Sequence, residues 1–404
     1  MVGDEMDGAK ARPGRILGLD ALRAVAAWLV LLSHVAFWTG AGAEGIIGGL
    51  AVRGELGVAI FFALSAYLLS TPFVRRALGG HVEWSLPRYL VRRAARILPG
   101  YLLALAFVVA VAALLGGAAA SALDVPTVLA HLVIGQGLTG ETFQAFTQTW
   151  SLTSEVTFYL LLPLAALVAA PLVRGVQAAP SARRLLGLCA VVALVGIGQQ
   201  GVAALVPDAR WGGLLATSAA GHAAWFAVGV AVAVLVESER AGCRPRSPLV
   251  EVLRTSPGTL ALLALVLWVV ASTPVAGPRG LEATTGSEAV AAEVLYGLVA
   301  ACLLLAGTSR GLTESLAASP VAGVLRWAGD ISYAVFLWHV LVLQVVFAAL
   351  DLRLFSAPFA SVLLLVTVVS VGLGHLSWTL LERPVLDRAH RTTAAREQQP
   401  APRA

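Results

Sequence analysis

Apolar stretches of about twenty residues recur along almost the whole chain, and short polar or arginine-bearing turns separate them. A helix of about twenty apolar residues is long enough to cross the hydrocarbon core of a bilayer. The pattern therefore predicts an all-α polytopic membrane protein. The ten expected transmembrane helices span residues 17–38, 56–73, 97–116, 155–173, 185–206, 213–236, 257–273, 289–307, 327–350 and 359–381.

Composition agrees with this pattern. Of the 404 residues, 58% are hydrophobic and only 13% are charged. These proportions are typical of a chain whose main partner is the lipid bilayer.

The basic residues predict how the chain is oriented. If the chain begins in the cytoplasm, all but four of its 28 Lys and Arg residues fall in cytoplasmic segments, as membrane proteins prefer. The four exceptions are Arg53, Arg210, Arg279 and Arg353. With a wrong number of spans, the Lys and Arg residues would be divided between both sides of the membrane. Their concentration on one side therefore favours ten helices with both termini in the cytoplasm. The net charge of +5 then reflects membrane topology, and it gives no reason to expect nucleic acid as a partner.

The chain is predicted to hold one transmembrane domain, residues 15–384, between two polar cytoplasmic segments. Residues 1–14 and 385–404 are expected to be disordered. The first apolar run is too long for a cleaved signal peptide and lacks a small-residue cleavage site. The three cysteines suggest neither a disulfide framework nor a metal site.

Two ionisable residues interrupt apolar helices and are candidates for chemistry. His34 lies in WLVLLSHVAFW, and Glu155 lies in WSLTSEVTFY. Polar groups at membrane depth are costly and usually functional. The predicted topology places both near the outer face. If their helices touch, the carboxylate would orient one ring nitrogen while the other takes a proton from a substrate hydroxyl.

Simpler roles compete with this hypothesis. His34 can hydrogen-bond to Ser33 as a packing residue, and Glu155 can reach the membrane interface. His222, His339 and His375 also fall in predicted spans, and each is a weak signal when taken alone.

A second candidate site is basic. Arg92, Arg93 and Arg96 lie on or near one face of a predicted helix, because residues three and four apart are helical neighbours. Guanidinium groups match the geometry of phosphate oxygens. The cluster therefore predicts a polyphosphate site, with the simple topological preference for basic residues as the alternative.

Six short segments follow one another in an order that is informative as a series. They are RILGLDALRAVAAWLVLLSH with Arg15, Asp20, Arg23 and His34; GVAIFFALSAYLL with Ser65; RAARILP with Arg93 and Arg96; WSLTSEVTFY with Trp150, Ser151, Glu155 and Tyr159; GDISYAVFLWH with Ser332, Tyr333 and His339; and LLERP with Glu382. The series resembles the motifs of the acyltransferase-3 family of bacterial integral-membrane acyltransferases. Ala66 and Phe336 depart from the family pattern, which usually has Gly and Tyr there.

The resemblance implies a bacterial inner-membrane enzyme that moves an acyl group, most often acetyl, from cytoplasmic acyl-CoA to a hydroxyl. The implied acceptor is a glycan, a glycolipid or a macrolide, and no permanently bound cofactor is implied. His34 would be the base, or a nucleophile that is acylated first. Glu155 would share the catalytic site. Asp20 and Arg23 would join the arginines in binding acyl-CoA, or would form an ion pair that locks the first helix.

Two other interpretations stay open. An exporter or flippase of a glycan or lipid-linked substrate would also have ten helices and buried polar residues, without a paired acid and base. A membrane acyltransferase of another family is the second alternative. An HxxxxD enzyme is excluded, since no histidine in the chain has an aspartate five positions later.

Overall fold

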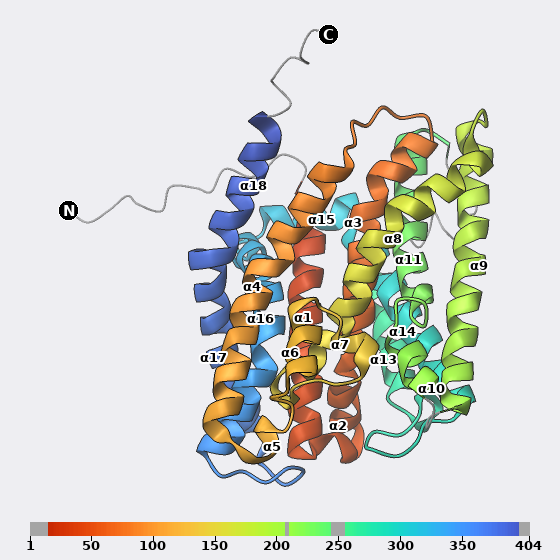
Figure 1. The fold of residues 1–404 in the computed structure, drawn as a ribbon. Coiled ribbons are helices and arrows are strands. Elements are labelled where there is room, and N and C mark those ends of the chain that lie inside the picture. Colours follow the sequence, from red (N-terminus) through yellow and green to blue (C-terminus); the bar gives the residue numbers. More distant parts are fainter. Residues whose placement is uncertain (1–14, 207–209, 244–254, 396–404) are drawn as a thin grey trace.

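The computed structural model describes residues 15–206, 210–243 and 255–395, and these residues form helices joined by turns, without strands (Figure 1). In chain order the elements are α1 Leu17–Thr39, η1 Ala41–Ala43, α2 Gly45–Val52, η2 Arg53–Leu56, α3 Gly57–Ala77, α4 Leu86–Leu115, α5 Gly117–Ala120, α6 Val125–Leu132, α7 Gln136–Thr139, η3 Gln144–Thr149, α8 Trp150–Val173, α9 Ala178–Leu205, α10 Arg210–Thr217, α11 Ala223–Arg240, α13 Pro257–Ala271, η4 Pro274–Ala276, α14 Gly286–Gly307, α15 Arg310–Ala318, α16 Ala322–Ala349, α17 Phe359–Ser377, η5 Trp378–Glu382 and α18 Arg383–Ala395.

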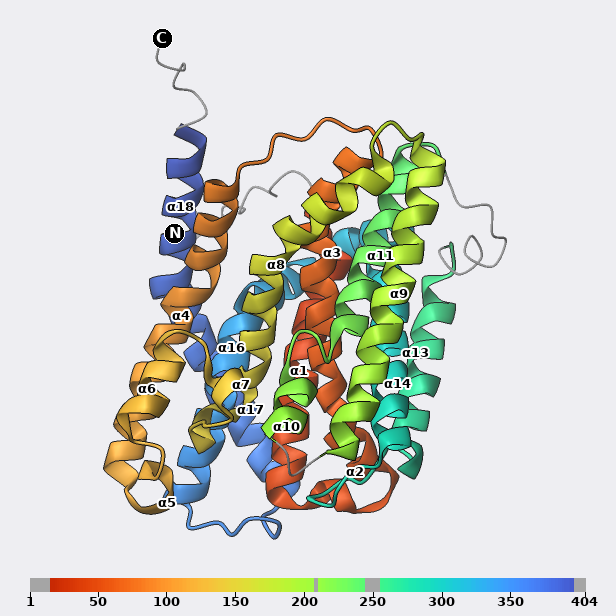
Figure 2. The same ribbon diagram turned by 45° about the vertical axis from the view of Figure 1, so that its right-hand side comes forward.

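The architecture is that of a multi-pass helical bundle. Within the described part of the chain, 8 helical segments are long and apolar enough to cross a membrane, and α13 is a shorter apolar helix of 15 residues. A helix lies in each of the ten predicted ranges. The number of crossings and the cytoplasmic position of the termini stay predictions. Helix α1 begins and α18 ends at the same end of the bundle (Figures 1 and 2). We call this the proximal end, and the end that carries α2 the distal end.

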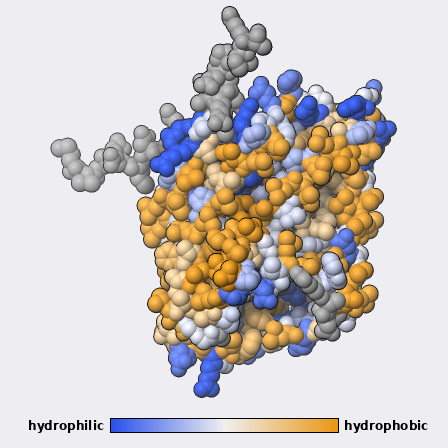
Figure 3. Space-filling view, viewed as in Figure 1, coloured by the Kyte–Doolittle hydropathy of each residue, from blue (hydrophilic) through white to orange (hydrophobic). Residues whose placement is uncertain are grey.

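The outer surface is apolar over most of its height. Leucines on the outward face of α8, such as Leu160, Leu164 and Leu167, are more than half exposed. Figure 3 shows a broad hydrophobic surface between hydrophilic patches at the two ends of the molecule. Such a surface suits contact with lipid, because the helices already satisfy their own backbone hydrogen bonds.

Several boundaries differ from the sequence prediction. Helix α4 begins at Leu86 and not at residue 97. The prediction located helices by runs of apolar residues, and the first turns of α4 contain several arginines. The predicted span 213–236 is broken into α10 and α11 by a turn at residues 218–222. At Gly221 a Cβ would lie 1.9 Å from the carbonyl oxygen of Leu215, so the tight turn needs glycine.

Two segments outside the predicted spans are helical. Between α4 and α8 the chain forms α5, α6, α7 and η3, and this segment packs on α4, where the Tyr101 hydroxyl donates to the His131 carbonyl at 2.8 Å. The predicted disordered tail begins as a helix, since α18 continues from α17 through a π-helical turn and packs on α4. Residues 1–14 and 396–404 lie outside the described residues.

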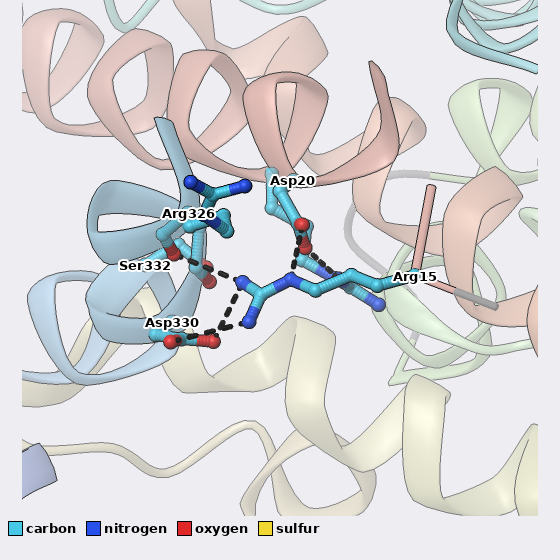
Figure 4. Close-up of polar contacts among 7 residues, drawn as sticks. Arg15, Asp20, Arg326, Asp330 and Ser332 are labelled. Atoms are coloured by element: carbon cyan, nitrogen blue, oxygen red, sulfur yellow. Dashed lines mark hydrogen bonds and ion pairs between the residues drawn. The ribbon is translucent and has the colours of Figure 1, made fainter. Parts of the chain in front are cut away.

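An ion-pair cluster at the proximal end joins α1 to α16. Asp20, only 3% exposed, accepts from Arg15 Nε at 2.5 Å and from Arg23 Nη1 at 2.9 Å. Arg15 also donates to Asp330 Oδ1 at 2.9 Å and to the Arg326 carbonyl at 3.0 Å (Figure 4). Removing one partner of a buried charge cluster is costly, because it leaves the remaining charges without compensation.

Small residues allow the closest helix contacts. A Cβ at Gly18 of α1 would lie 2.2 Å from the Gly307 carbonyl oxygen of α14. A Cβ at Gly229 of α11 would lie 2.7 Å from the methyl group of Ala66 on α3. Ala66 is fully buried, so the glycine on the facing helix makes room for the alanine that stands where the family usually has glycine.

Replacing Asp20 with Asn should destabilise the protein by on the order of 3 kcal/mol, because Arg15 and Arg23 lose the carboxylate that compensates them. The measurement is the midpoint of thermal unfolding in detergent. The matched control is Arg310→Gln, which breaks an exposed pair with Glu314 and should cost below about 1 kcal/mol. Equal shifts for the two variants would show that the cluster does not hold α1.

Gly18→Ala should lower the unfolding midpoint, because the added methyl group meets backbone and overpacking costs about 1–3 kcal/mol. Gly323→Ala is the control, since nothing lies within 4 Å of a Cβ there and alanine favours helix. A Gly18→Ala protein as stable as the control would contradict the close approach of α1 and α14.

Candidate functional site

A cavity of about 860 Å³ opens in the distal half of the bundle, between α1, α9, α11 and α14. We call it the distal cavity. Its polar lining includes His34, Glu55, Gln200, His222, Glu293 and Tyr296, and its apolar lining includes the rings of Trp150 and Trp225. A concave site with apolar walls and a few convergent polar groups is the usual form of a small-molecule site.

The His34 ring is held from one side. Its Nδ1 lies 2.8 Å from the Val30 carbonyl oxygen and 3.3 Å from Nε2 of His339. A carbonyl oxygen only accepts, so Nδ1 carries the hydrogen. His339 likewise donates from Nδ1 to the Phe336 carbonyl at 2.8 Å, and its Nε2 is left to accept from His34. The network therefore assigns His34 the tautomer whose Nε2 has a free lone pair.

Glu155 is not the group that orients His34. Its Oε1 accepts from the hydroxyls of Ser65 and Tyr159. Gly57 on α3 packs against α1 at Ala26 and Val30. Ser65 lies eight residues proximal of Gly57 and His34 lies four residues distal of Val30, so the two groups are roughly 18 Å apart along the bundle at the helical rise per residue.

The depth of Glu155 differs from the prediction for a physical reason. The predicted span begins at Glu155, which places this residue at the outer face. In the structure α8 follows η3, whose Phe146 and Thr149 are fully buried, and Gln136 Nε2 donates to the Thr149 carbonyl at 2.9 Å. Helix α8 therefore begins among other helices, with Trp150 already at the distal cavity.

A second group of polar residues holds the cavity rim. The Tyr296 hydroxyl donates to Glu55 Oε1 at 2.5 Å. Arg53 is 6% exposed and donates to the carbonyl oxygens of Gly277 at 2.5 Å and Pro278 at 3.0 Å. These contacts fasten the connection between α13 and α14 to the start of α3.

A buried histidine–carboxylate pair faces the same cavity. His222 Nδ1 lies 2.9 Å from Glu293 Oε2, and the side chains of these residues are 9% and 2% exposed. His222 is the last residue of the turn at 218–222 and directly precedes α11. Glu293 is an ionisable residue inside a predicted span, as Glu155 is, but it is not among the predicted site residues.

Two arginines of the predicted phosphate site stand at the proximal end. Arg93 lies over the ring of Tyr159 at 6.0 Å, and Arg96 lies over Tyr333 at 5.5 Å and Trp378 at 5.4 Å. Both are half-buried, and within the described residues neither has an ion pair. Arg92, on the same helix, already interacts with another residue.

Glu382 lies in the π-helical turn after α17 and is 2% exposed. The Ser377 hydroxyl donates to its Oε1 at 2.8 Å, while Oε2 has no partner among the described side chains. A Cβ at Gly100 would lie 3.0 Å from Oε1, so α4 passes close to this carboxylate. Motif residues far apart in sequence therefore meet around Arg93 and Arg96. We call this group the proximal cluster, and its members are Ser65, Arg93, Arg96, Glu155, Tyr159, Tyr333 and Glu382.

Other motif positions support the fold. Ser332 donates to the Gly329 carbonyl at 2.8 Å, and Ser151 donates to the Gln148 carbonyl at 3.0 Å. Asp20 and Arg23, predicted either to bind acyl-CoA or to lock the first helix, pair with each other, and Asp20 also pairs with Arg15. This geometry matches the locking role.

A row of rings links the two sites. Phe61 lies one turn distal of Ser65 on α3 and contacts Phe336 with ring centroids 6.0 Å apart. Phe336 in turn lies 6.0 Å from His339, whose ring is 5.0 Å from that of His34. The proximal cluster and the distal cavity are thus joined through the interior of the bundle.

Comparison with known proteins identifies the family. The model of the acyltransferase-3 family, described as an acyltransferase domain, matches residues 16–375, nearly the whole chain. Comparison with curated proteins and with solved structures yields no match. The match includes the helices that build the proximal cluster up to α17 and those that build the distal cavity. With its apolar helices, the chain belongs to the acyltransferase-3 family and is a membrane acyltransferase.

Proposed function

We propose that the protein transfers an acetyl group from cytoplasmic acyl-CoA to a hydroxyl of a carbohydrate or sugar-bearing acceptor, with His34 as the base. The observation that carries this proposal is the arrangement of His34. Its Nδ1 is held by the Val30 carbonyl at 2.8 Å, and its ring lines the distal cavity. A neutral imidazole with a fixed tautomer and a free Nε2 is suited to take a proton from a hydroxyl.

The proximal cluster supports a site for the donor. Arg93 and Arg96 are half-buried cations without an ion pair among the described residues. Glu155 and Glu382 lie near enough to interact with these arginines electrostatically, but neither forms a direct ion pair with them among the described residues. The guanidinium hydrogens are therefore available to the phosphates of acyl-CoA, since guanidinium groups bind phosphate through paired hydrogen bonds. The arginine distribution assigns this end of the bundle to the cytoplasm, where acyl-CoA is found.

The reaction balances with the groups present. The acceptor oxygen attacks the thioester carbonyl while His34 Nε2 takes the hydroxyl proton. The carbon–sulfur bond then breaks, and the leaving thiolate receives that proton to give free CoA and an ester. In the two-step version, Nε2 itself attacks the thioester carbonyl and CoA leaves as the thiolate, which gives an acyl-histidine. The acceptor hydroxyl then attacks this acyl group, the bond to Nε2 breaks, and the hydroxyl proton passes to the thiolate.

We assign the acyl-bearing arm of the donor to the row of rings from Phe61 to His339, which pack against one another and would have to move apart to admit it. This row leads from the proximal cluster to His34 through protein and not through lipid. Glu155 lies at the proximal start of this path beside Ser65, so we assign it a role in the donor site. This assignment replaces the direct contact with His34 that the sequence suggested.

His34→Ala should lower the rate of acyl transfer about 100- to 10,000-fold, the usual contribution of a general base. Purified protein in nanodiscs is incubated with radiolabelled acetyl-CoA, and hydrolysis or exchange of the thioester is followed. His131→Asn is the control, because His131 is fully buried away from the cavity, against Phe143 and Thr127. An exporter would show no thioester turnover in the wild-type protein. Full activity in His34→Ala would remove His34 from the mechanism.

Replacing both Arg93 and Arg96 with Gln should raise the KM for acetyl-CoA at least about tenfold, since hydrogen bonds to charged groups each contribute about 1.5–3 kcal/mol. The effect should shrink for a donor that lacks the nucleotide, such as an acetylated pantetheine. Arg174→Gln is the matched control, because Arg174 is exposed at the end of α8. An unchanged KM in the double variant would place the donor elsewhere.

A further inference from the structure

His222 and Glu293 form a polar pair that the proposed transfer step does not use. They come from α11 and α14, and the distance from Nδ1 to Oε2 is 2.9 Å. Both side chains line the distal cavity together with His34. Oε1 of Glu293 is buried and has no partner among the described side chains. A pair of this kind is costly to place at membrane depth unless it has a use.

The imidazole of His222 is fixed on several sides. Trp225 stacks on it with ring centroids 4.1 Å apart, and Trp150 lies 5.3 Å away. The Trp225 indole is itself held by donation to the Glu293 carbonyl at 2.9 Å. Nδ1 donates to the carboxylate and also lies 3.3 Å from the amide nitrogen of Gln200, so Nε2 is the ring nitrogen left for a ligand. Nε2 has no hydrogen bond among the described residues, and the ring lines the cavity wall.

Two histidines therefore each present a ring nitrogen to one cavity. We infer that His222 Nε2 forms a hydrogen bond with a second hydroxyl of the acceptor while the attacked hydroxyl lies at His34. The acceptor is then a polyol or a sugar unit with at least two hydroxyls, and a simple alcohol binds poorly. His222 is a positioning residue that selects the acceptor, and Glu293 holds its ring in place. This inference rests on the proposed function.

The cavity wall fits a sugar ring in a second way. The rings of Trp150 and Trp225 lie beside His222, and Gln200 and Tyr296 add polar groups to the same wall. Sugars combine an apolar C–H face with hydroxyls at the edge, so they match a wall where an indole meets hydrogen-bonding side chains. A bound hydroxyl also satisfies the unpartnered His222 Nε2.

A purely structural role for the pair makes a different prediction. In that case His222 only joins α11 to α14, and its loss would lower stability or the amount of active protein. The KM for the acceptor and the preference among acceptors would then stay as in the wild type. Acceptor selectivity is therefore the property that separates the two roles.

The test uses the full-length protein in nanodiscs with radiolabelled acetyl-CoA. The acceptor probes are methyl hexopyranosides and their monodeoxy derivatives. We expect the wild type to acetylate a methyl hexopyranoside. The derivative that lacks the hydroxyl bound by His222 should have a KM at least tenfold higher than the intact sugar. In His222→Ala, the KM of the intact sugar should rise by a similar factor, so that the two sugars have about the same KM. His222→Gln should restore part of the affinity, because its amide group can hydrogen-bond to the sugar hydroxyl in place of Nε2.

His375→Ala is the matched control, because His375 lies outside the cavity and pairs with Trp327 at 3.1 Å. The inference is overturned if no hexopyranoside is acetylated while the wild type hydrolyses acetyl-CoA, or if no deoxy derivative differs from its parent. It also fails if His222→Ala changes kcat alone. Should that variant not fold, the wild-type deoxy series still decides. Absence of any acetyl-CoA turnover by the wild type would instead refute the proposed function.

Discussion

Asp20 is a carboxylate buried between α1 and α16, and the position of the catalytic candidate depends on it. Arg15 and Arg23 compensate its charge, and Arg15 extends the cluster to Asp330 on α16. At the other end of the same two helices, His34 meets His339. Because α1 and α16 run in parallel and helices are stiff, fixing their proximal ends also sets the register at the distal cavity. A lipid environment strengthens this constraint, because an unpaired charge there cannot be stabilised by water.

The histidine is oriented by neutral groups. The Val30 carbonyl and His339 hold Nδ1 of His34, so the ring is oriented without a charged hydrogen-bond partner. A carboxylate in contact would favour the imidazolium and would itself need compensation inside the membrane. The carboxylates that line the same cavity have other hydrogen-bond partners, since Glu55 accepts from Tyr296 and Glu293 pairs with His222. Glu155 lies among hydroxyls and arginines.

Irregular backbone occurs where polar chemistry is concentrated. The break between α10 and α11 presents His222, the π-helical turn presents Glu382, and η3 leads into Trp150. Interrupted helices at membrane depth are tolerated where they are buried in protein or line a cavity, and there they mark binding sites. In this protein the three interruptions border either the distal cavity or the proximal cluster.

The sequence by itself determined the helical membrane class, the approximate spans and the family positions, including His34 and the arginines of α4. Long apolar runs and ordered motifs carry that information locally. The sequence could not determine partners. It placed Glu155 level with His34, whereas the structure joins Glu155 to Ser65 and joins His34 to His339. It also passed over the pair of His222 and Glu293. Lipid-facing and protein-facing residues are both apolar, so the pattern does not encode helix rotation, depth or the breaks within a span. Only tertiary packing decides which polar groups meet.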